Sequence, residues 1–375
     1  MIAWLLISFF VLLFLGVPIA MSLGLSAMGG ILFLGGGSTV TIAQRMFEGM
    51  NSFALLAIPL YTFAGFTMSK GGISKRLMDF CYSIVGHIYG GLAHVNVLSS
   101  MIFAGISGSA VADTAGVSGM FMPEMIRKGY SKNFTVAVTA ISSTIGIIIP
   151  PSIPMVVIAG ICGISTGKLF LGGIIPGILC GLAQMIVSYF LAKKEGVPKE
   201  PGHFTIGPVL HGLWESWPAL LMPIIIVGTI TMGIVSPTEA GVIAVVYGLF
   251  AGGIIYRELK WEDIKFAFAE TVRTSGRIFI VIGAAKLYTV MLTTAGFDKW
   301  VAKTMLGFST NPTVILIMIL LIFFIVTMFM ESIATLTLFM PILYPIALGV
   351  GINPIVLSVL ITVVIGIGLV TPPVG

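Results

Sequence analysis

Two short stretches combine acidic residues with small hydroxyl-bearing residues inside an otherwise apolar sequence. "SGSAVADTAGVSGMFMP" (107–123) carries Asp113, and "MESIATLTLFMP" (330–341) carries Glu331. A charged side chain at the centre of a membrane helix costs at least about 2.5–3.5 kcal/mol, so each carboxylate requires a compensating partner. Carboxylate, hydroxyl and carbonyl oxygens are the preferred ligands of hard cations. The two stretches therefore predict cation sites, with proton carriage and capping of a half-helix as open alternatives.

Both side chains and unwound backbone are expected to supply oxygen atoms to these sites. The residues that we expect to contribute to cation binding are Ser107, Gly108, Ser109, Asp113, Gly146, Ile149, Glu331, Thr335, Gly366 and Thr371. Half-helix N-termini present N–H groups to an anionic substrate. The residues that we expect near such a substrate are Ser109, Ala110, Ser152, Thr335, Thr337 and Lys286. Lys286 is the one basic residue inside a predicted span, and it pairs either with an anionic substrate or with an acidic neighbour.

The composition indicates that these stretches lie in a membrane. Of the 375 residues, 57% are hydrophobic and 9% are charged, and the mean hydropathy is +1.12. Soluble domains carry roughly 25% charged residues, so we predict an all-α polytopic membrane protein. The longest polar connection, from about Lys193 to Leu210, is too short to fold as an ATPase domain. The net charge of +5 does not indicate nucleic-acid binding, because Lys and Arg in membrane proteins mostly mark cytoplasmic loops.

The sequence contains an internal repeat. "VADTAGVSGMFMP" (111–123) aligns without a gap to "FMESIATLTLFMP" (329–341), which pairs Asp113 with Glu331. About thirty residues after each of these segments comes a Pro-Pro segment: "GIIIPPSIP" (146–154) in the first half is matched by "GLVTPPVG" (368–375) in the second. The two halves therefore share one plan, in which a Gly/Ser/Thr-rich element precedes a helix that is interrupted by Pro-Pro.

Each half is predicted to contain a re-entrant helical hairpin, at 90–125 and at 312–349. Backbone that is not helical cannot face lipid, because each unsatisfied peptide group costs several kcal/mol there. The hairpin tips and the Pro-Pro-broken helices should therefore line an inner, wet site. The sequence stops two residues after Pro373, and the repeat predicts a last span within roughly 40–50 further residues.

Basic residues segregate to one face if the hairpins enter and leave on the same side. The 14 that share this face are Lys70, Lys75, Arg76, Arg127, Lys128, Lys132, Lys193, Lys194, Lys199, Arg257, Lys260, Lys265, Arg273 and Arg277. The other face holds Arg45, Lys168, Lys299 and Lys303. Because Lys and Arg are enriched in cytoplasmic loops, the first face is predicted to be cytoplasmic and the N-terminus periplasmic. The hairpins then enter from opposite sides, as two inverted-topology repeats.

Five motifs together resemble one transporter family over essentially the whole chain. They are "NSFALLAIPLYTFAG", "SGSAVADTAGVSGMFMPEM", "GIIIPPSIPMVVIAG", "SPTEAGVIAVVYG" and "MESIATLTLFMPILYP". They resemble the large membrane (permease) subunit of tripartite ATP-independent periplasmic (TRAP) transporters. The resemblance implies sodium-coupled uptake of small organic anions, such as C4-dicarboxylates or sialic acid, across the bacterial inner membrane. It also implies an elevator mechanism, with Na+ as the coupling ion bound between each hairpin tip and the facing broken helix.

The resemblance also implies partners and a division of the chain into scaffold and transport parts. The partners are a small four-helix membrane subunit and a periplasmic substrate-binding protein. The first half is expected to comprise scaffold helices and an interfacial arm (1–52) and a transport-domain half with the first hairpin (53–162). A span and a cytoplasmic linker (163–214) follow. The second half is expected to comprise further scaffold helices and an arm (215–273) and a transport-domain half with the second hairpin (274–375), whose final span is expected beyond the sequence.

Two other functions stay open from the residues alone. One is an ion-coupled carboxylate transporter of similar build that needs no binding protein. The other is an intramembrane hydrolase with Asp113 and Glu331 as a catalytic pair, which would require the two carboxylates to lie within a few ångströms of each other. The repeat instead assigns them to hairpins that enter from opposite faces, so we expect a protein that is not an enzyme.

Overall fold

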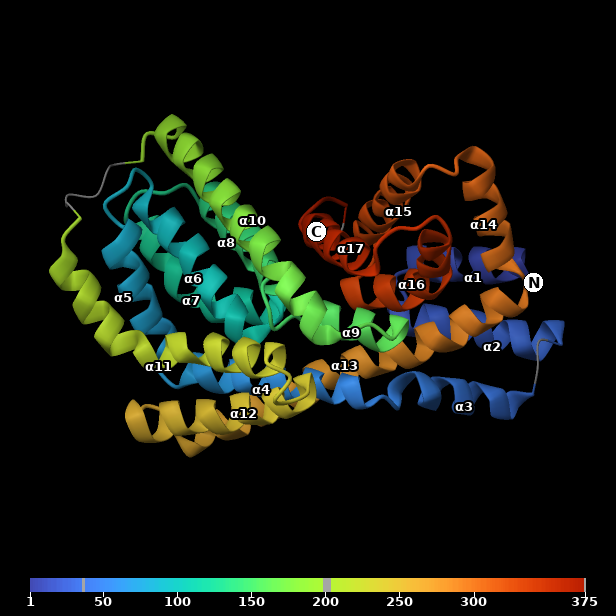
Figure 1. Ribbon diagram of the computed structural model, residues 1–375, viewed down its shortest axis with the longest axis horizontal. Helices are drawn as coiled ribbons and strands as arrows, with labels where there is room; N and C mark the ends of the chain where they lie inside the picture. Colours follow the sequence, from blue (N-terminus) through green and yellow to red (C-terminus); the bar gives the residue numbers. More distant parts are fainter. Residues whose placement is uncertain (36–37, 198–203, 374–375) are drawn as a thin grey trace. The chain divides into compact units, whose positions relative to one another are not determined.

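The computed structural model describes residues 1–35, 38–197 and 204–373 of the chain. Within these ranges the regular structure consists of 17 α-helices and short 3-10 and π-helical turns (Figure 1). The predicted all-α class is therefore confirmed for the described residues. Lys199, which we counted among the cytoplasmic basic residues, and the middle of the predicted linker 163–214 lie outside them.

Six helical segments of the described chain are long and apolar enough to cross a membrane. They are η1 with α4 (Phe53–Lys70), α10 (Thr166–Lys194), α11 (Ile206–Thr231), α12 with the π-helical turn η3 (Pro237–Ile255), α13 (Trp261–Thr294) and α16 (Ser332–Gly349). The shorter apolar helices are α1 (Ile2–Phe14), α2 (Ile19–Leu34), α6 (Gly91–Ser107), α9 (Ile153–Cys162), α15 (Pro312–Thr327) and α17 (Pro354–Gly368). These lengths and compositions agree with a polytopic membrane protein.

The helices form two compact units. The first unit comprises Met1–Leu56, Pro154–Ser165 and Thr274–Gly375, and the second comprises Ala57–Ile153 and Thr166–Arg273. Each unit contains one of the two predicted hairpins.

In the second unit, the predicted hairpin consists of α6 and α7 (Ala110–Arg127), which pack against each other. The helix breaks at Gly108, whose φ of 63° favours glycine. The Pro-Pro-interrupted helix follows as α8 (Lys132–Ser143) and η2 (Thr144–Ile147), and it continues into α9, which belongs to the first unit from Pro154 onward. Helix α6 packs against α4, α5 (Ile73–Val85), α8 and α10, and this packing holds the hairpin in place (Figure 1).

In the first unit, the second hairpin consists of α15 and α16, and α17 packs against both helices. Asn-Pro pairs start two of these helices, because the Asn311 and Asn353 side chains cap the N-termini and the following prolines occupy the first helical position. The core of this unit joins α1, α2, α13 and α16. Within it, the buried Tyr288 hydroxyl donates a hydrogen bond to the carbonyl oxygen of Leu5 at 2.8 Å.

The structure differs from the sequence prediction in two places. We expected an arm to end the part at 215–273 and a separate transport-domain half to begin at 274, but α13 is one continuous helix of 34 residues across this boundary. No proline interrupts this segment, and Gly276 faces open space within the helix. The expected connections at 70–90 and 295–312 contain the amphipathic helices α5 and α14 (Phe297–Phe308), which have one apolar face each.

Candidate functional site

The tip of the first hairpin lies directly against the broken helix. A Cβ atom added at Gly108 would lie 2.6 Å from the carbonyl oxygen of Pro151. The Ile153 amide donates a hydrogen bond to the carbonyl oxygen of Gly108 at 3.0 Å. A Cβ atom added at Gly146 would lie 3.2 Å from the carbonyl oxygen of Ser109. The two glycines therefore let the backbones of the tip and the broken helix meet, as the sequence predicted.

The other predicted residues of this tip are also gathered here. The Ser107 hydroxyl is buried and lies 3.5 Å from both the amide nitrogen and the carbonyl oxygen of Ser109. Ser109 caps α7, whose first residue is Ala110. Ser152 is buried and donates a hydrogen bond within the broken turn. The side chain of Ile149 packs against a glycine of α10. Because this side chain is aliphatic, the peptide group is the part of Ile149 that can bind a cation.

Asp113 lies one turn into α7 and is completely buried. Neither carboxylate oxygen accepts a hydrogen bond from a described residue. The Ser100 and Ser143 hydroxyls lie beside it, but they donate elsewhere, to Ser142 Oγ at 3.3 Å and to the carbonyl oxygen of Thr139 at 2.8 Å. The Asp113 carboxylate therefore lies among hydroxyl and carbonyl oxygens, with two serine hydroxyls close enough to donate to it.

The capping alternative applies to Glu331 and not to Asp113. Glu331 is the N-cap of α16, and its Oε2 accepts hydrogen bonds from the amides of Ile333 (3.0 Å) and Ala334 (3.3 Å). In α7 the capping residue is Ser109. The two carboxylates that the gapless alignment paired thus occupy different positions relative to their helices.

At the second hairpin, the end of α15 meets the end of α17. A Cβ atom added at Gly368 would lie 2.7 Å from Cβ of Thr327, the last residue of α15. Thr335 is completely buried in the first turn of α16. Gly366 is buried in α17, and Thr371 follows that helix. The predicted residues of this tip therefore lie on elements that pack together within the first unit.

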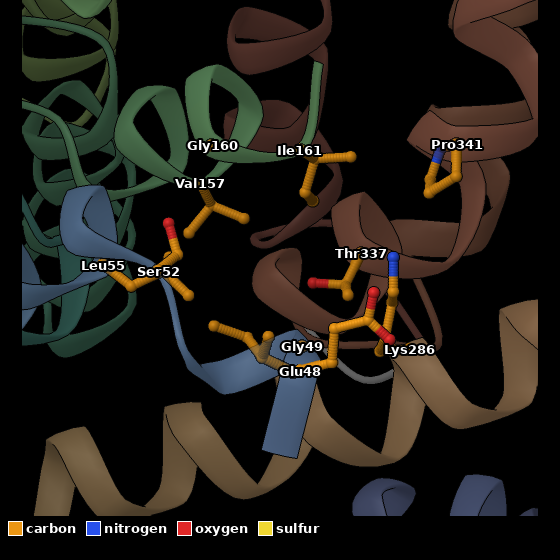
Figure 2. Close-up of a pocket in the computed structure, with 11 residues that line it drawn as sticks. Glu48, Gly49, Ser52, Leu55, Val157, Gly160, Ile161, Lys286, Thr337 and Pro341 are labelled. Atoms are coloured by element: carbon orange, nitrogen blue, oxygen red, sulfur yellow. The ribbon is translucent and has the colours of Figure 1, made fainter. Parts of the chain in front are cut away.

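A cavity of about 180 Å³ opens within the first unit. Residues of α3 (Thr39–Met50), α9, α13 and α16 line it, together with the segment that follows α3 (Figure 2). Two predicted substrate residues, Lys286 and Thr337, meet in its wall. Sequence reasoning missed Glu48 and Ser52, which also line it. Their only signal was a carboxylate and a hydroxyl close to Gly49, at the end of an amphipathic arm.

The cavity carries charges of both signs. Lys286 has no hydrogen-bond or ion-pair partner among the described residues. Glu48 Oε2 accepts a hydrogen bond from Arg45 at 2.8 Å. This hydrogen bond and the charge of Arg45 lower the pKa of Glu48, and the charge of Lys286 lowers it further. The cavity therefore presents one ionised carboxylate and one unpaired ammonium group.

Within the described residues, no group of three or more His, Cys, Asp or Glu side chains could hold a metal ion.

Comparison with known proteins identifies the family. The sequence profile described as "Tripartite ATP-independent periplasmic transporter, DctM component" matches residues 6–375. The chain belongs to this TRAP transporter family. The resemblance stated from the motifs is therefore confirmed. Because the family consists of transporters and not enzymes, the expectation of a multi-pass membrane protein without enzymatic activity is confirmed as well.

Named TRAP permeases from three bacteria resemble the chain along nearly its whole length. The isethionate TRAP transporter permease protein DctMQ of Oleidesulfovibrio alaskensis is 38% identical over 98% of the chain, which spans 58% of that protein. The sialic acid TRAP transporter large permease protein SiaM of Vibrio cholerae is 36% identical over 97% of the chain and 85% of SiaM. The C4-dicarboxylate TRAP transporter large permease protein DctM of Pseudomonas aeruginosa is 37% identical over 94% of the chain and 83% of DctM.

Proposed function

We propose that this chain is the transporting membrane subunit of a sodium-coupled uptake system for small organic anions in the bacterial inner membrane. The names of its relatives support this substrate class, since isethionate, sialic acid and C4-dicarboxylates are all organic acids. An imported sodium ion supplies about 2.3 kcal/mol for each 100 mV of membrane potential. Uptake against a gradient is therefore possible without ATP.

The environment of Asp113 carries the sodium proposal. It is a buried carboxylate whose oxygens accept no hydrogen bond in the geometry of the described residues. The Ser100 and Ser143 hydroxyls are close enough to donate to it, but in this geometry they donate elsewhere. An uncompensated charge of this kind is costly within a membrane, and a bound cation removes that cost. Sodium, a hard cation, fits an oxygen-only set of ligands. Ser107, Gly108, Ser109, Gly146 and Ile149 complete the proposed first site.

The second proposed sodium site lies at the second hairpin. It uses Thr335, Gly366 and Thr371, which lie on elements that pack together. Glu331 contributes its negative charge while its side chain caps α16. The two sites belong to different units of the fold, so each can be disabled without altering the ligands of the other.

Lys286 and Thr337 are the proposed anchors of the organic acid. They line the same cavity, and Lys286 is a cation without a partner among the described residues. We further propose that Ser109, Ala110 and Ser152 at the first tip, and Thr335 at the second, each lie where a helix N-terminus favours the negative charge of a substrate. An anion bound at Lys286 removes the cost of an unpaired charge in a membrane protein.

We further propose an elevator mechanism, in which the hairpins and broken helices move with the substrate against a scaffold. The proposed partners are a small four-helix membrane subunit and a periplasmic binding protein that delivers the anion. Membership in a family of tripartite periplasmic transporters supports both partners. Uptake that persists without any periplasmic protein would favour a binding-protein-independent transporter instead.

Thermal unfolding of the purified protein in sodium and in potassium, at fixed ionic strength and pH, tests the sodium proposal without a known substrate. A cation at 100 times its dissociation constant stabilises the folded protein by about 2.7 kcal/mol. We expect a sodium-specific rise in Tm that Asp113→Asn and Thr335→Val each reduce, and that enlargement of Ser109 to leucine also reduces.

Two variants at exposed positions outside both hairpins are the controls. Glu262→Gln removes an exposed carboxylate, and Thr304→Val removes an exposed hydroxyl that bonds only to its own helix. Both should keep the full sodium response. Identical curves in sodium and potassium, with a shift only at acid pH, would contradict the proposal and favour Asp113 and Glu331 as proton carriers.

A further inference from the structure

The cavity in the first unit separates hydrogen-bond donors from acceptors. Lys286 contributes an ammonium group with three N–H donors and no acceptor. The Ser52 hydroxyl has no hydrogen bond with a described residue, so it is free to donate. Both groups line the cavity. An acid group of a ligand would find its donors here.

The remaining polar groups of the cavity accept hydrogen bonds. The Thr337 hydroxyl donates to the carbonyl oxygen of Ile333 at 2.8 Å, so only its lone pairs face a ligand. Glu48 uses Oε2 for Arg45, and its Oε1 is without a hydrogen bond from a described residue. Arg45 itself does not line the cavity. A ligand therefore meets the carboxylate of Glu48 and not the guanidinium group that pairs with it.

Glu48 and Lys286 lie close without forming an ion pair. Their side chains rise from α3 and α13 toward the same space (Figure 2), and Lys286 lowers the pKa of Glu48 through space. The described residues nevertheless include no ion pair between them. A small ligand that carries both an acid and a donor group can bind between two such charges.

The packing of α3 on α13 fixes Lys286 in this position. A Cβ atom added at Gly49 would lie 2.6 Å from Cβ and 2.9 Å from Cγ of Lys286. Only glycine at this position lets the two helices approach so closely. Gly49 thus sets the separation between Lys286 and the neighbouring Glu48.

We infer that Glu48 is a specificity-determining residue, which selects organic acids that carry a hydroxyl or amino group and disfavours a second carboxylate. Lys286 and Ser52 bind the acid group, and Glu48 and Thr337 accept hydrogen bonds from the donor group. A second carboxylate would face Glu48, and like charges in contact oppose binding. This inference rests on the proposed function as a transporter of organic anions.

Three acids with a backbone of four carbons separate these effects. Butyrate has one carboxylate, 4-hydroxybutyrate adds a hydroxyl at the far end, and succinate has a second carboxylate there. Equilibrium binding of each radiolabelled acid is measured on the full chain with its small membrane subunit in lipid nanodiscs, at fixed sodium. We expect 4-hydroxybutyrate to bind about tenfold more tightly than succinate. Glu48→Gln should remove most of this difference by improving succinate binding.

Lys286→Met should weaken the binding of all three acids about tenfold or more. Lys303→Met and Glu262→Gln change exposed residues that do not line the cavity, and they should leave every affinity unchanged. The Tm of each variant checks that it is folded, and Glu48 is itself exposed.

The outcomes distinguish the two proposals. If all three acids bind and Lys286→Met abolishes binding, but Glu48→Gln leaves their affinity ratios unchanged, the inference about Glu48 is wrong and the proposed function stands. If none of the three acids binds the unaltered protein, the inference about Glu48 is contradicted, and the proposed function is decided separately by the sodium response of Tm.

Discussion

Asp113 and Glu331 show how two carboxylates with similar sequence surroundings take different positions: Asp113 is completely buried, whereas Glu331 is exposed. Glu331 accepts two backbone hydrogen bonds at the start of α16, so its charge is compensated by the helix N-terminus. Asp113 lies one turn farther into its helix, and its oxygens accept no hydrogen bond from a described residue. We therefore expect a bound cation to compensate more of the charge at Asp113 than at Glu331.

This difference predicts the effect of removing the Glu331 side chain. Glu331→Ala leaves the first amides of α16 without a capping partner, and the loss of an N-cap costs about 0.5–2 kcal/mol. Glu331→Ser keeps a capping oxygen and should retain most of that stability. Thermal unfolding in sodium-free potassium buffer measures both variants. An alanine variant as stable as the unaltered protein would show that the cap does not stabilise α16.

Sequence reasoning singled out the individual tip residues because their chemistry is unusual in an apolar chain. Ser107, Gly108 and Ser109 stand out by type alone, and the structure brings them against the broken helix. Glu48 and Ser52 could not be found in this way, since they belong to an ordinary amphipathic segment. Their significance depends on which side chains of α9, α13 and α16 share the cavity, and that is set by tertiary packing.

At the scale of elements, Gly108 joins the hairpin tip to the broken helix. It combines a φ of +63° with a position where a Cβ atom would lie 2.6 Å from the carbonyl oxygen of Pro151. Gly108→Ala should therefore cost more than the roughly 1–2 kcal/mol of a left-handed non-glycine residue. It should also weaken the sodium response, because the tip must move away from the broken helix.

A matched glycine separates strain from close approach. Gly163 has nearly the same backbone conformation, with a φ of +67°, but a Cβ atom there would meet nothing within 4 Å. Gly163→Ala should cost only the conformational strain and keep the full sodium response. Sodium titrations followed by thermal unfolding compare the two variants, and equal losses in both would refute a special role for the tip contact.

The order of the helices was largely predictable from the sequence, but which segments join into one continuous helix was not. Glycine and serine at the tips and Pro-Pro in the broken helices are local signals that end helices, so the hairpins and the interruption between α8 and α9 follow from sequence. The junction at 274–276 lacks such a signal, and α13 runs through it without a break. Amphipathic helices α5 and α14 fall in segments that hydropathy alone marks as connections.

At the scale of the whole molecule, the distribution of basic residues predicts topology. The connection at 295–312 is expected to be periplasmic, and that at 257–277 cytoplasmic. Single cysteines at Thr310 and Lys260, which are both exposed, can be introduced after Cys81, Cys162 and Cys180 are replaced. In cells with a permeabilised outer membrane, a membrane-impermeant maleimide should label Thr310→Cys and should label Lys260→Cys only after the inner membrane is disrupted. The reverse pattern would invert the predicted orientation.

Coupling between sodium and the organic acid is the central claim, and it can be measured directly. If both ligands stabilise the same state, sodium must raise the affinity for the acid, and the acid must raise the affinity for sodium by the same factor. We would measure 4-hydroxybutyrate binding to the full chain with its membrane partner in sodium and in potassium, for the unaltered protein and for Asp113→Asn. The account predicts an affinity about fivefold or more higher in sodium, and a loss of this difference in Asp113→Asn. Equal affinities in sodium and potassium would contradict it.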